Sequence, residues 1–247
     1  MRTLVLVLLF GLVSACRARE LTVEQKLVVA CYKLDVDAVA KLLREGADVN
    51  ARFGQGETLE HFREGWYGGT PMSAGEWTPL HALANSETYP DPEIPYENTV
   101  ERLNWSDRNR LKAPKSEIEK RVLRRTTIFY ILLSHGCNLD NRDSRGASPI
   151  YDAIARRHEA LAMLLLDQAP QINTKTGIYI DGHGDNTPLH AACWSSTLTS
   201  RLIKMGADES STNTAGETPL DYRIRLQVRE ETTQRLQQEL RDLQNTR

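Results

Sequence analysis

Short apolar segments at helical spacing alternate along the chain with polar turns, and one four-residue signal opens several of them. Full copies of the signal are Thr78-Pro79-Leu80-His81 and Thr187-Pro188-Leu189-His190, and looser copies are Ser148-Pro149-Ile150-Tyr151 and Thr218-Pro219-Leu220-Asp221. Thr caps a helix, and Pro is tolerated at the first helical position because its missing N–H would have no intrahelical partner. Apolar residues such as Leu189, Ala192, Leu202 and Ile203 follow at helical spacing. The pattern predicts stacked pairs of short helices.

The second helix of several pairs ends at a glycine turn. Gly46, Gly136 and Gly206 stand where the chain must enter a left-handed conformation. The turn within Leu42 to Asn50 closes a first unit whose opening signal is lost. The third unit has Ala169-Pro170 instead of a glycine turn, so its second helix is expected to end less regularly.

These motifs resemble the ankyrin repeat, a helix-turn-helix unit with a hairpin and a period of about 33 residues. The resemblance covers Leu21 to about Leu226 and implies an all-α, ankyrin-like helical repeat solenoid. It also implies structural roles for Thr78, Pro79, Thr187 and Pro188 and for the three turn glycines. In the ankyrin pattern, His81 and His190 form local hydrogen bonds that hold the turn between repeats. Neither histidine is expected to bind a metal.

The spacing of the repeats predicts two large insertions. With Gln25 aligned as the start of the first unit, the starts of successive units lie 53, 70, 39 and 31 residues apart. Compared with a period of about 33, the excess falls in the hairpin of the first unit, residues 52–76, and between the helices of the second, residues 85–124. A smaller excess, Thr174 to Asp185, lengthens the third hairpin. Insertions in repeat proteins lie on loops, often on the binding face.

Aromatic residues mark the two large insertions as the candidate partner-binding surface. The candidates are Trp66, Tyr67 and Trp77 from the first and Tyr89, Tyr96 and Trp105 from the second. Aromatic side chains are enriched at interface hot spots because they bury a large area at little rotamer cost. The alternative, equally open at this stage, is that they fold back and cover the stack as a satellite cluster.

The second insertion is acidic in its first half and basic in its second. The basic half is expected to enter a helix at Lys115, and its charges either bind an acidic partner or form a solvated helix face. The whole chain carries a net charge of −2 and contains no known nucleic-acid reader motif. We therefore expect no nucleic-acid binding.

The amino terminus has the pattern of an exported protein. Arg2 precedes an apolar run from Leu4 to Val13, which is too short for a membrane span and typical of a signal-peptide core. Val13-Ser14-Ala15-Cys16 resembles the lipobox of bacterial lipoproteins. That resemblance implies cleavage of residues 1–15, a diacylglyceryl group on Cys16 and a tether over residues 16–20, which anchor the protein to a membrane of the cell envelope. Ordinary secretion after cleavage behind Ala15 is the alternative.

The sequence offers little for catalysis or covalent cross-linking. The three remaining cysteines, Cys31, Cys137 and Cys193, are odd in number and are expected to be small buried apolar residues. Asp181, His183 and Asp185 lack the ligand spacing of a calcium loop, so we predict neither a metal nor a cofactor. Nucleophile and phosphate-binding motifs are lacking too, and Glu60, His61 and Glu64 are only a weak acid-base candidate.

The last part of the chain, residues 227–247, predicts a capping helix that covers the open end of the stack. Together these features predict a non-catalytic protein-interaction module in the cell envelope, monomeric apart from its partner. Inhibiting or stabilising an envelope enzyme is the specific form of this role. The alternative is a hydrolase or cation-binding protein that uses the insertions.

Overall fold

The computed structural model describes residues 21–52, 76–86, 115–177, 184–228 and 232. The helices in these ranges are α2 (Val23–Lys33), α3 (Val36–Arg44), α4 (Pro79–Ala84), α6 (Lys115–Ser134), α7 (Pro149–Ala155), α8 (Glu159–Leu166), α9 (Pro188–Ala191) and α10 (Ser196–Lys204). The short 3₁₀ helix η4 (Ala192–Trp194) continues α9, and a further helical segment covers residues 219–228. The described part contains one isolated antiparallel bridge, Thr176 with Asn186, in the third hairpin.

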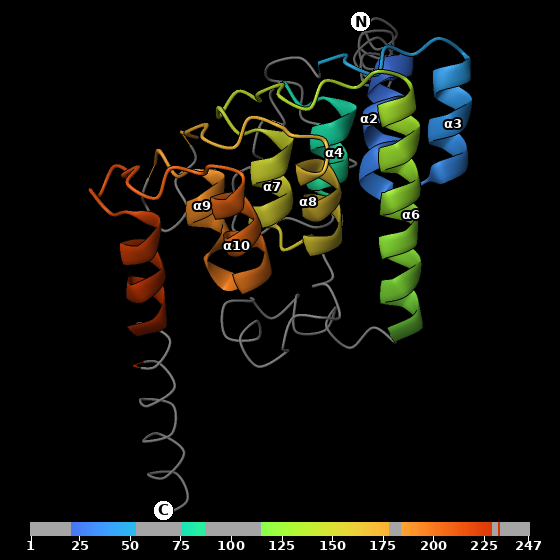
Figure 1. The fold of residues 1–247 in the computed structure, drawn as a ribbon. Coiled ribbons are helices and arrows are strands. Elements are labelled where there is room, and N and C mark those ends of the chain that lie inside the picture. Colours follow the sequence, from blue (N-terminus) through green and yellow to red (C-terminus); the bar gives the residue numbers. More distant parts are fainter. Residues whose placement is uncertain (1–20, 53–75, 87–114, 178–183, 229–231, 233–247) are drawn as a thin grey trace, which may run out of the picture.

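The helices form two layers that run in chain order (Figure 1). The first helices of the units, α2, α4, α7 and α9, contact one another in sequence, and the second helices, α3, α6, α8 and α10, do the same beside them. Each pair buries its apolar side against the next, so one continuous core runs along the stack. The predicted all-α, ankyrin-like solenoid is confirmed.

Polar caps start the first helices as the sequence predicts. The side chains of Thr78 and Thr187 accept hydrogen bonds from the backbone N–H groups of His81 and His190, and Ser148 does the same for Tyr151. The first unit lacks the four-residue signal but still begins with a polar cap. Thr22 forms a capping box with Gln25, since each side chain bonds the other residue's backbone N–H.

The two repeat histidines link neighbouring units. His81 accepts a hydrogen bond at Nδ1 from the Thr78 hydroxyl (2.9 Å) and donates from Nε2 to the Ala147 carbonyl (3.0 Å). His190 repeats this arrangement with Thr187 at 2.8 Å and the Glu217 carbonyl at 3.0 Å. Each carbonyl lies at the start of the following unit, so the predicted structural role of both histidines is confirmed.

The turns after the second helices show why glycine is preferred there. Gly46, Gly136 and Gly206 have φ values of 91°, 78° and 88°. After each glycine, the next residue donates its backbone N–H to a carbonyl in the helix, as Ala47 does to Leu42. In the third unit Ala169 takes the left-handed conformation instead (φ 51°), and Pro170 has no N–H to donate. The third turn therefore resembles the others in its left-handed residue. It has one hydrogen bond fewer, and its alanine is strained.

Two of the three cysteines lie in the core, as predicted. Cys31 and Cys137 are buried, whereas Cys193 is half-buried, so the prediction is wrong for Cys193. Burial raises the pKa of Cys137 to about 11. Burial, with a smaller contribution from Cys137, also raises the pKa of Cys31 far above its usual value. Both thiols are therefore protonated and unreactive near neutral pH.

Candidate protein-binding surface

The first insertion is closed at its base by an ion pair. The guanidinium of Arg52 lies 2.9 Å from the Glu76 carboxylate, so the two ends of the segment 53–75 are held together. Trp66 and Tyr67 lie inside this segment, outside the described residues. Their predicted role as contacts therefore stays a prediction.

The prediction that Trp77 contacts a partner is wrong. Its side chain is only 3% exposed and belongs to the hydrophobic core. The Arg145 guanidinium lies 6.0 Å from the centre of its ring, within the range of a cation–π contact. Trp77 therefore anchors the downstream end of the first insertion to the stack, because a large aromatic side chain there fills core volume next to the Thr78 cap.

The second insertion begins at a buried polar network. Asn85, which ends α4, donates from Nδ2 to the His81 carbonyl (2.9 Å) and to the Asp152 carboxylate (2.6 Å), and its Oδ1 accepts from Arg156 (3.1 Å). Asp152 comes from α7 of the next unit. The amide of Asn85 therefore fixes the start of the insertion to two neighbouring units at once.

The next residue, Ser86, is bonded just as firmly. Its hydroxyl accepts a hydrogen bond from Arg125 of α6 (3.0 Å), and its carbonyl accepts one from His158 (3.3 Å). Arg125 and His158 are both buried. The two ends of the insertion, Ser86 and the helix that begins at Lys115, are thus linked through the side chain of Arg125.

Burial controls the ionisation of this network. Burial raises the pKa of Asp152, while Arg145, whose Nη2 lies 3.6 Å away, opposes that shift. Burial, then the positive charge of Arg125, holds the pKa of His158 well below its usual value. Burial also lowers the pKa of His81. The histidines are therefore neutral near pH 7, which matches their roles as donors to backbone carbonyls.

The second insertion ends in α6, whose outer face is exposed. The helix begins at Lys115, as predicted, and is 20 residues long, against 9, 8 and 9 for the other outer helices α3, α8 and α10. Its first turns extend past the neighbouring helices (Figure 1). Tyr89, Tyr96 and Trp105 precede this helix and lie outside the described residues.

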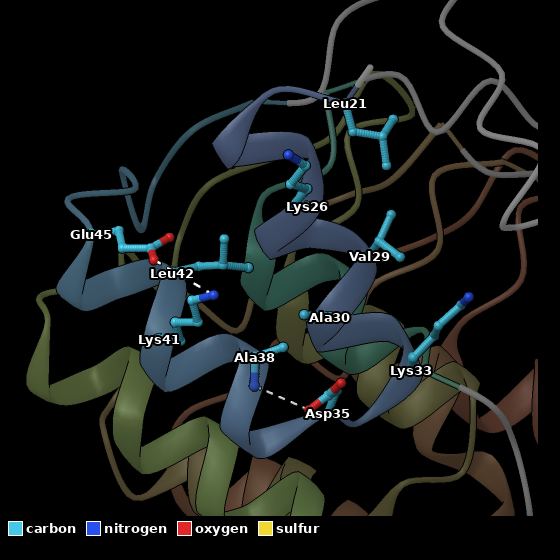
Figure 2. Close-up of a pocket in the computed structure, with 10 residues that line it drawn as sticks. All are labelled: Leu21, Lys26, Val29, Ala30, Lys33, Asp35, Ala38, Lys41, Leu42 and Glu45. Atoms are coloured by element: carbon cyan, nitrogen blue, oxygen red, sulfur yellow. Dashed lines mark hydrogen bonds and ion pairs between the residues drawn. The ribbon is translucent and has the colours of Figure 1, made fainter. Parts of the chain in front are cut away.

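Further exposed apolar surface lies at the two ends of the described stack. A groove of about 400 Å³ lies between α2 and α3 (Figure 2). Its apolar lining includes Leu21, Val29 and Leu42, and three lysines and the carboxylates of Asp35 and Glu45 also line it. At the other end, the segment 219–228 buries Tyr222 but exposes Leu220, Ile224 and Val228. The outer face of the last described helix is therefore apolar, and the predicted cap over residues 227–247 lies almost wholly outside the described part.

Within the described ranges, no group of three or more His, Cys, Asp or Glu side chains is placed to hold a metal ion. Asp181 and His183, like Glu60, His61 and Glu64, fall outside the description, and so does Cys16. Among the helices that the structure describes, none is long and apolar enough to cross a membrane.

The described helices therefore form an all-α helical repeat of the ankyrin type. No family model matches the sequence. Over 113 residues, 45% of this chain, the sequence is 33% identical to ankyrin repeat and SOCS box protein 11 of Danio rerio. The match covers 36% of that protein, so the chain spans about a third of the relative's length. The similarity supports ankyrin repeats and, in general terms, a role in protein interaction.

Proposed function

We propose that this chain is a non-catalytic protein-interaction module of the cell envelope, with the two insertions as its specific contacts. The observation that carries the proposal is the way the insertions are mounted. The Arg52–Glu76 ion pair closes the first, and the bonds of Asn85 and Ser86 to α6 and α7 fix the base of the second. Loops held at both ends by a rigid scaffold need less ordering when they bind.

The repeat stack supports the same role. Ankyrin-type units supply a stiff frame whose surface positions set the identity of the partner. Inhibition or stabilisation of an envelope enzyme fits such a frame, since a rigid surface with projecting loops covers an active-site cleft without chemistry of its own.

The proposed location rests on Cys16. A diacylglyceryl group on its sulfur carries two acyl chains, which would anchor the protein stably, whereas a single acyl chain binds only weakly. Changing Cys16→Ser in the full chain should abolish incorporation of labelled palmitate and release the protein from the membrane fraction. Release into the medium of a wild-type protein without label would instead support the secreted alternative.

Affinity capture from envelope extract tests the interaction role. The bait is a form that starts at Arg17, compared with forms in which residues 53–75 or 87–114 are replaced by a short linker. Removal of residues 178–183, in the third hairpin, is the matched control. We expect one protein to be retained by the complete form and by the control, and lost from at least one insertion-deleted form.

Two results would contradict the proposal. Equal retention by all forms would place binding elsewhere on the stack. Turnover of a substrate by the purified chain without any partner would make it an enzyme, in line with the hydrolase alternative. Circular dichroism of each form confirms that the repeats remain folded.

A further inference from the structure

The outward side of α6 differs from that of the other outer helices. Its inward side is set by the buried residues Arg125, Ile128, Phe129 and Leu132. Each residue turns a helix by about 100°, so Lys120, Leu123, Thr127 and Tyr130 form a line opposite the buried side. Leu123 and Tyr130 are 66% and 52% exposed, so two large apolar side chains lie on the same solvent-facing side of the helix.

The line has the spacing of a helix that docks in a groove. Leu123, Thr127 and Tyr130 stand at positions i, i+4 and i+7, the anchor pattern of helix-in-groove recognition. The Thr127 hydroxyl donates to the Leu123 carbonyl within the helix (2.9 Å). Its polar group is therefore already satisfied, and the methyl group is left to continue the apolar line.

Positive charge lies at the start of the line and beside it. Two other cations of α6 pair with carboxylates, Lys115 with Glu119 at 3.8 Å and Arg121 with Glu117 at 3.4 Å. Lys120, at the start of the line, and Arg124, about 100° around the helix from Leu123, are exposed and form no ion pair with another described residue. A surface that docks here gains two ion pairs in addition to apolar burial.

We propose that the outward face of α6 binds a protein partner whose apolar groove is rimmed by carboxylates. The inference rests on the proposed interaction function and adds the chemistry of the partner and a contact on α6, the helix in which the second insertion ends. An anionic lipid surface fits less well, because recognition of such surfaces takes about 4–8 clustered cations and this face offers two. A second copy also fits less well. The groove between α2 and α3 has three lysines and two carboxylates, and Asp35 already accepts from the Ala38 N–H while Glu45 pairs with Lys41 at 3.8 Å.

Site-specific photo-cross-linking in the native cell tests this proposal with the full-length chain. Tyr130 is replaced by the photoreactive residue p-benzoylphenylalanine. The matched control carries it at Ile203, an exposed apolar position on outer helix α10 whose neighbour Arg201 is already paired with Asp167 at 2.8 Å. We expect an adduct from position 130 that is absent from position 203 and that maps to a groove containing Asp or Glu.

The charge requirement is tested in the same format. Changing Lys120→Glu and Arg124→Glu together should lower the adduct yield about tenfold or more, because like charges then face each other. Changing the mapped carboxylates of the partner to Lys should restore the yield. Because both substituted residues are exposed, the melting temperature of the variant should be unchanged. This measurement checks that the fold is intact.

Other outcomes overturn the proposal. An adduct to phospholipid, to another copy of this chain or to a protein site without carboxylates excludes the proposed partner, and so does the absence of any adduct at position 130. A third variant, with the photoreactive residue at Trp66, separates the two hypotheses. A protein adduct from position 66 alone keeps the proposed function and rejects the α6 contact, whereas no protein adduct from either position rejects both.

Discussion

Two adjacent arginines of α6 occupy opposite environments. Arg125 is buried and donates to Ser86 at the base of the second insertion, whereas Arg124 is exposed to solvent on the outward face. The residues have the same charge and length. Their positions differ by one step of the helix, which decides whether the charge holds the stack together or stays available for a partner.

The general lesson concerns where charge contributes to stability. A buried donor that loses its partner costs its full desolvation free energy, whereas an exposed charge exchanges a protein contact for water at little cost. The base of the second insertion is therefore a structural region, and the outward face of α6 is free to evolve for binding.

The largest expected effect comes from removing the buried arginine. Arg125→Ala should lower the free energy of unfolding by about 3 kcal/mol, because Ser86 loses a charge-assisted hydrogen bond and a cavity replaces the side chain. Arg124→Ala should change it by less than about 0.5 kcal/mol. Urea unfolding of the soluble form measures both, and equal losses would contradict the comparison.

Acid should weaken the buried region next. The folded-state pKa of His158 lies well below its unfolded value, so the unfolded chain binds a proton first as pH falls. The associated stability is present above pH 6.5 and is lost below it, at about 2 kcal/mol between pH 7 and pH 5 if the folded state stays neutral.

The variant His158→Gln isolates this contribution. Glutamine retains a donor for the Ser86 carbonyl but does not titrate, so the loss of stability between pH 7 and pH 5 should become smaller. His135→Gln, on an exposed histidine in the turn after α6, is the matched control. Thermal unfolding at both pH values measures the difference, and an unchanged pH dependence in the His158 variant would reject the assignment.

Ala169 sharpens the comparison between buried and exposed residues, because it is exposed and its backbone conformation still affects stability. Its left-handed conformation is unfavourable for a residue with a Cβ atom. Ala169→Gly should therefore raise the free energy of unfolding by about 1 kcal/mol. The greater conformational entropy of glycine in the unfolded chain offsets part of this gain. Gly136→Ala, at the matching turn of the second unit, should destabilise by a similar amount. Equal stability of the two variants and the wild type would show that the turns carry no strain.

Local signals explain how much of the fold the sequence predicts. The Thr caps bond N–H groups three residues on, and the turns at the glycines close within five residues, so each unit is visible in the sequence. The repeat histidines belong to the same local signal, although their Nε2 atoms bond carbonyls 66 and 27 residues away. The alignment of the units does not single out Thr22, because it places the start of the first unit at Gln25. Gln25 is the partner of Thr22 in the capping box. The start of α6 at Lys115 was predicted because its apolar spacing is also local.

The candidate site is harder to predict because its contacts are distant in sequence. Asn85 and Asp152 are 67 residues apart, and Ser86 and Arg125 are 39 apart. Composition marked Trp77 as a binding aromatic, but only its neighbours in the stack determine that it is buried. The exposed line on α6 became visible only once the buried side of the helix was known.

The smallest expected effect concerns the ion pair of Arg121. The exposure of this residue is between that of the buried Arg125 and that of the exposed Arg124. Arg121 pairs with Glu117 one turn before Arg125, and its side chain is 20% exposed while that of Glu117 is 40% exposed. Glu117→Gln should lower the free energy of unfolding by about 0.3 kcal/mol, the usual value for an i,i+4 pair. The loss should fall toward zero in about 1 M salt, where the screening length is about 3 Å. The Arg125→Ala effect should persist there, because its hydrogen bond is buried and poorly screened. A salt-independent loss for Glu117→Gln would show that the pair acts as a buried contact, and the boundary between the structural and the free side of α6 would then lie farther out than the exposure of its residues indicates.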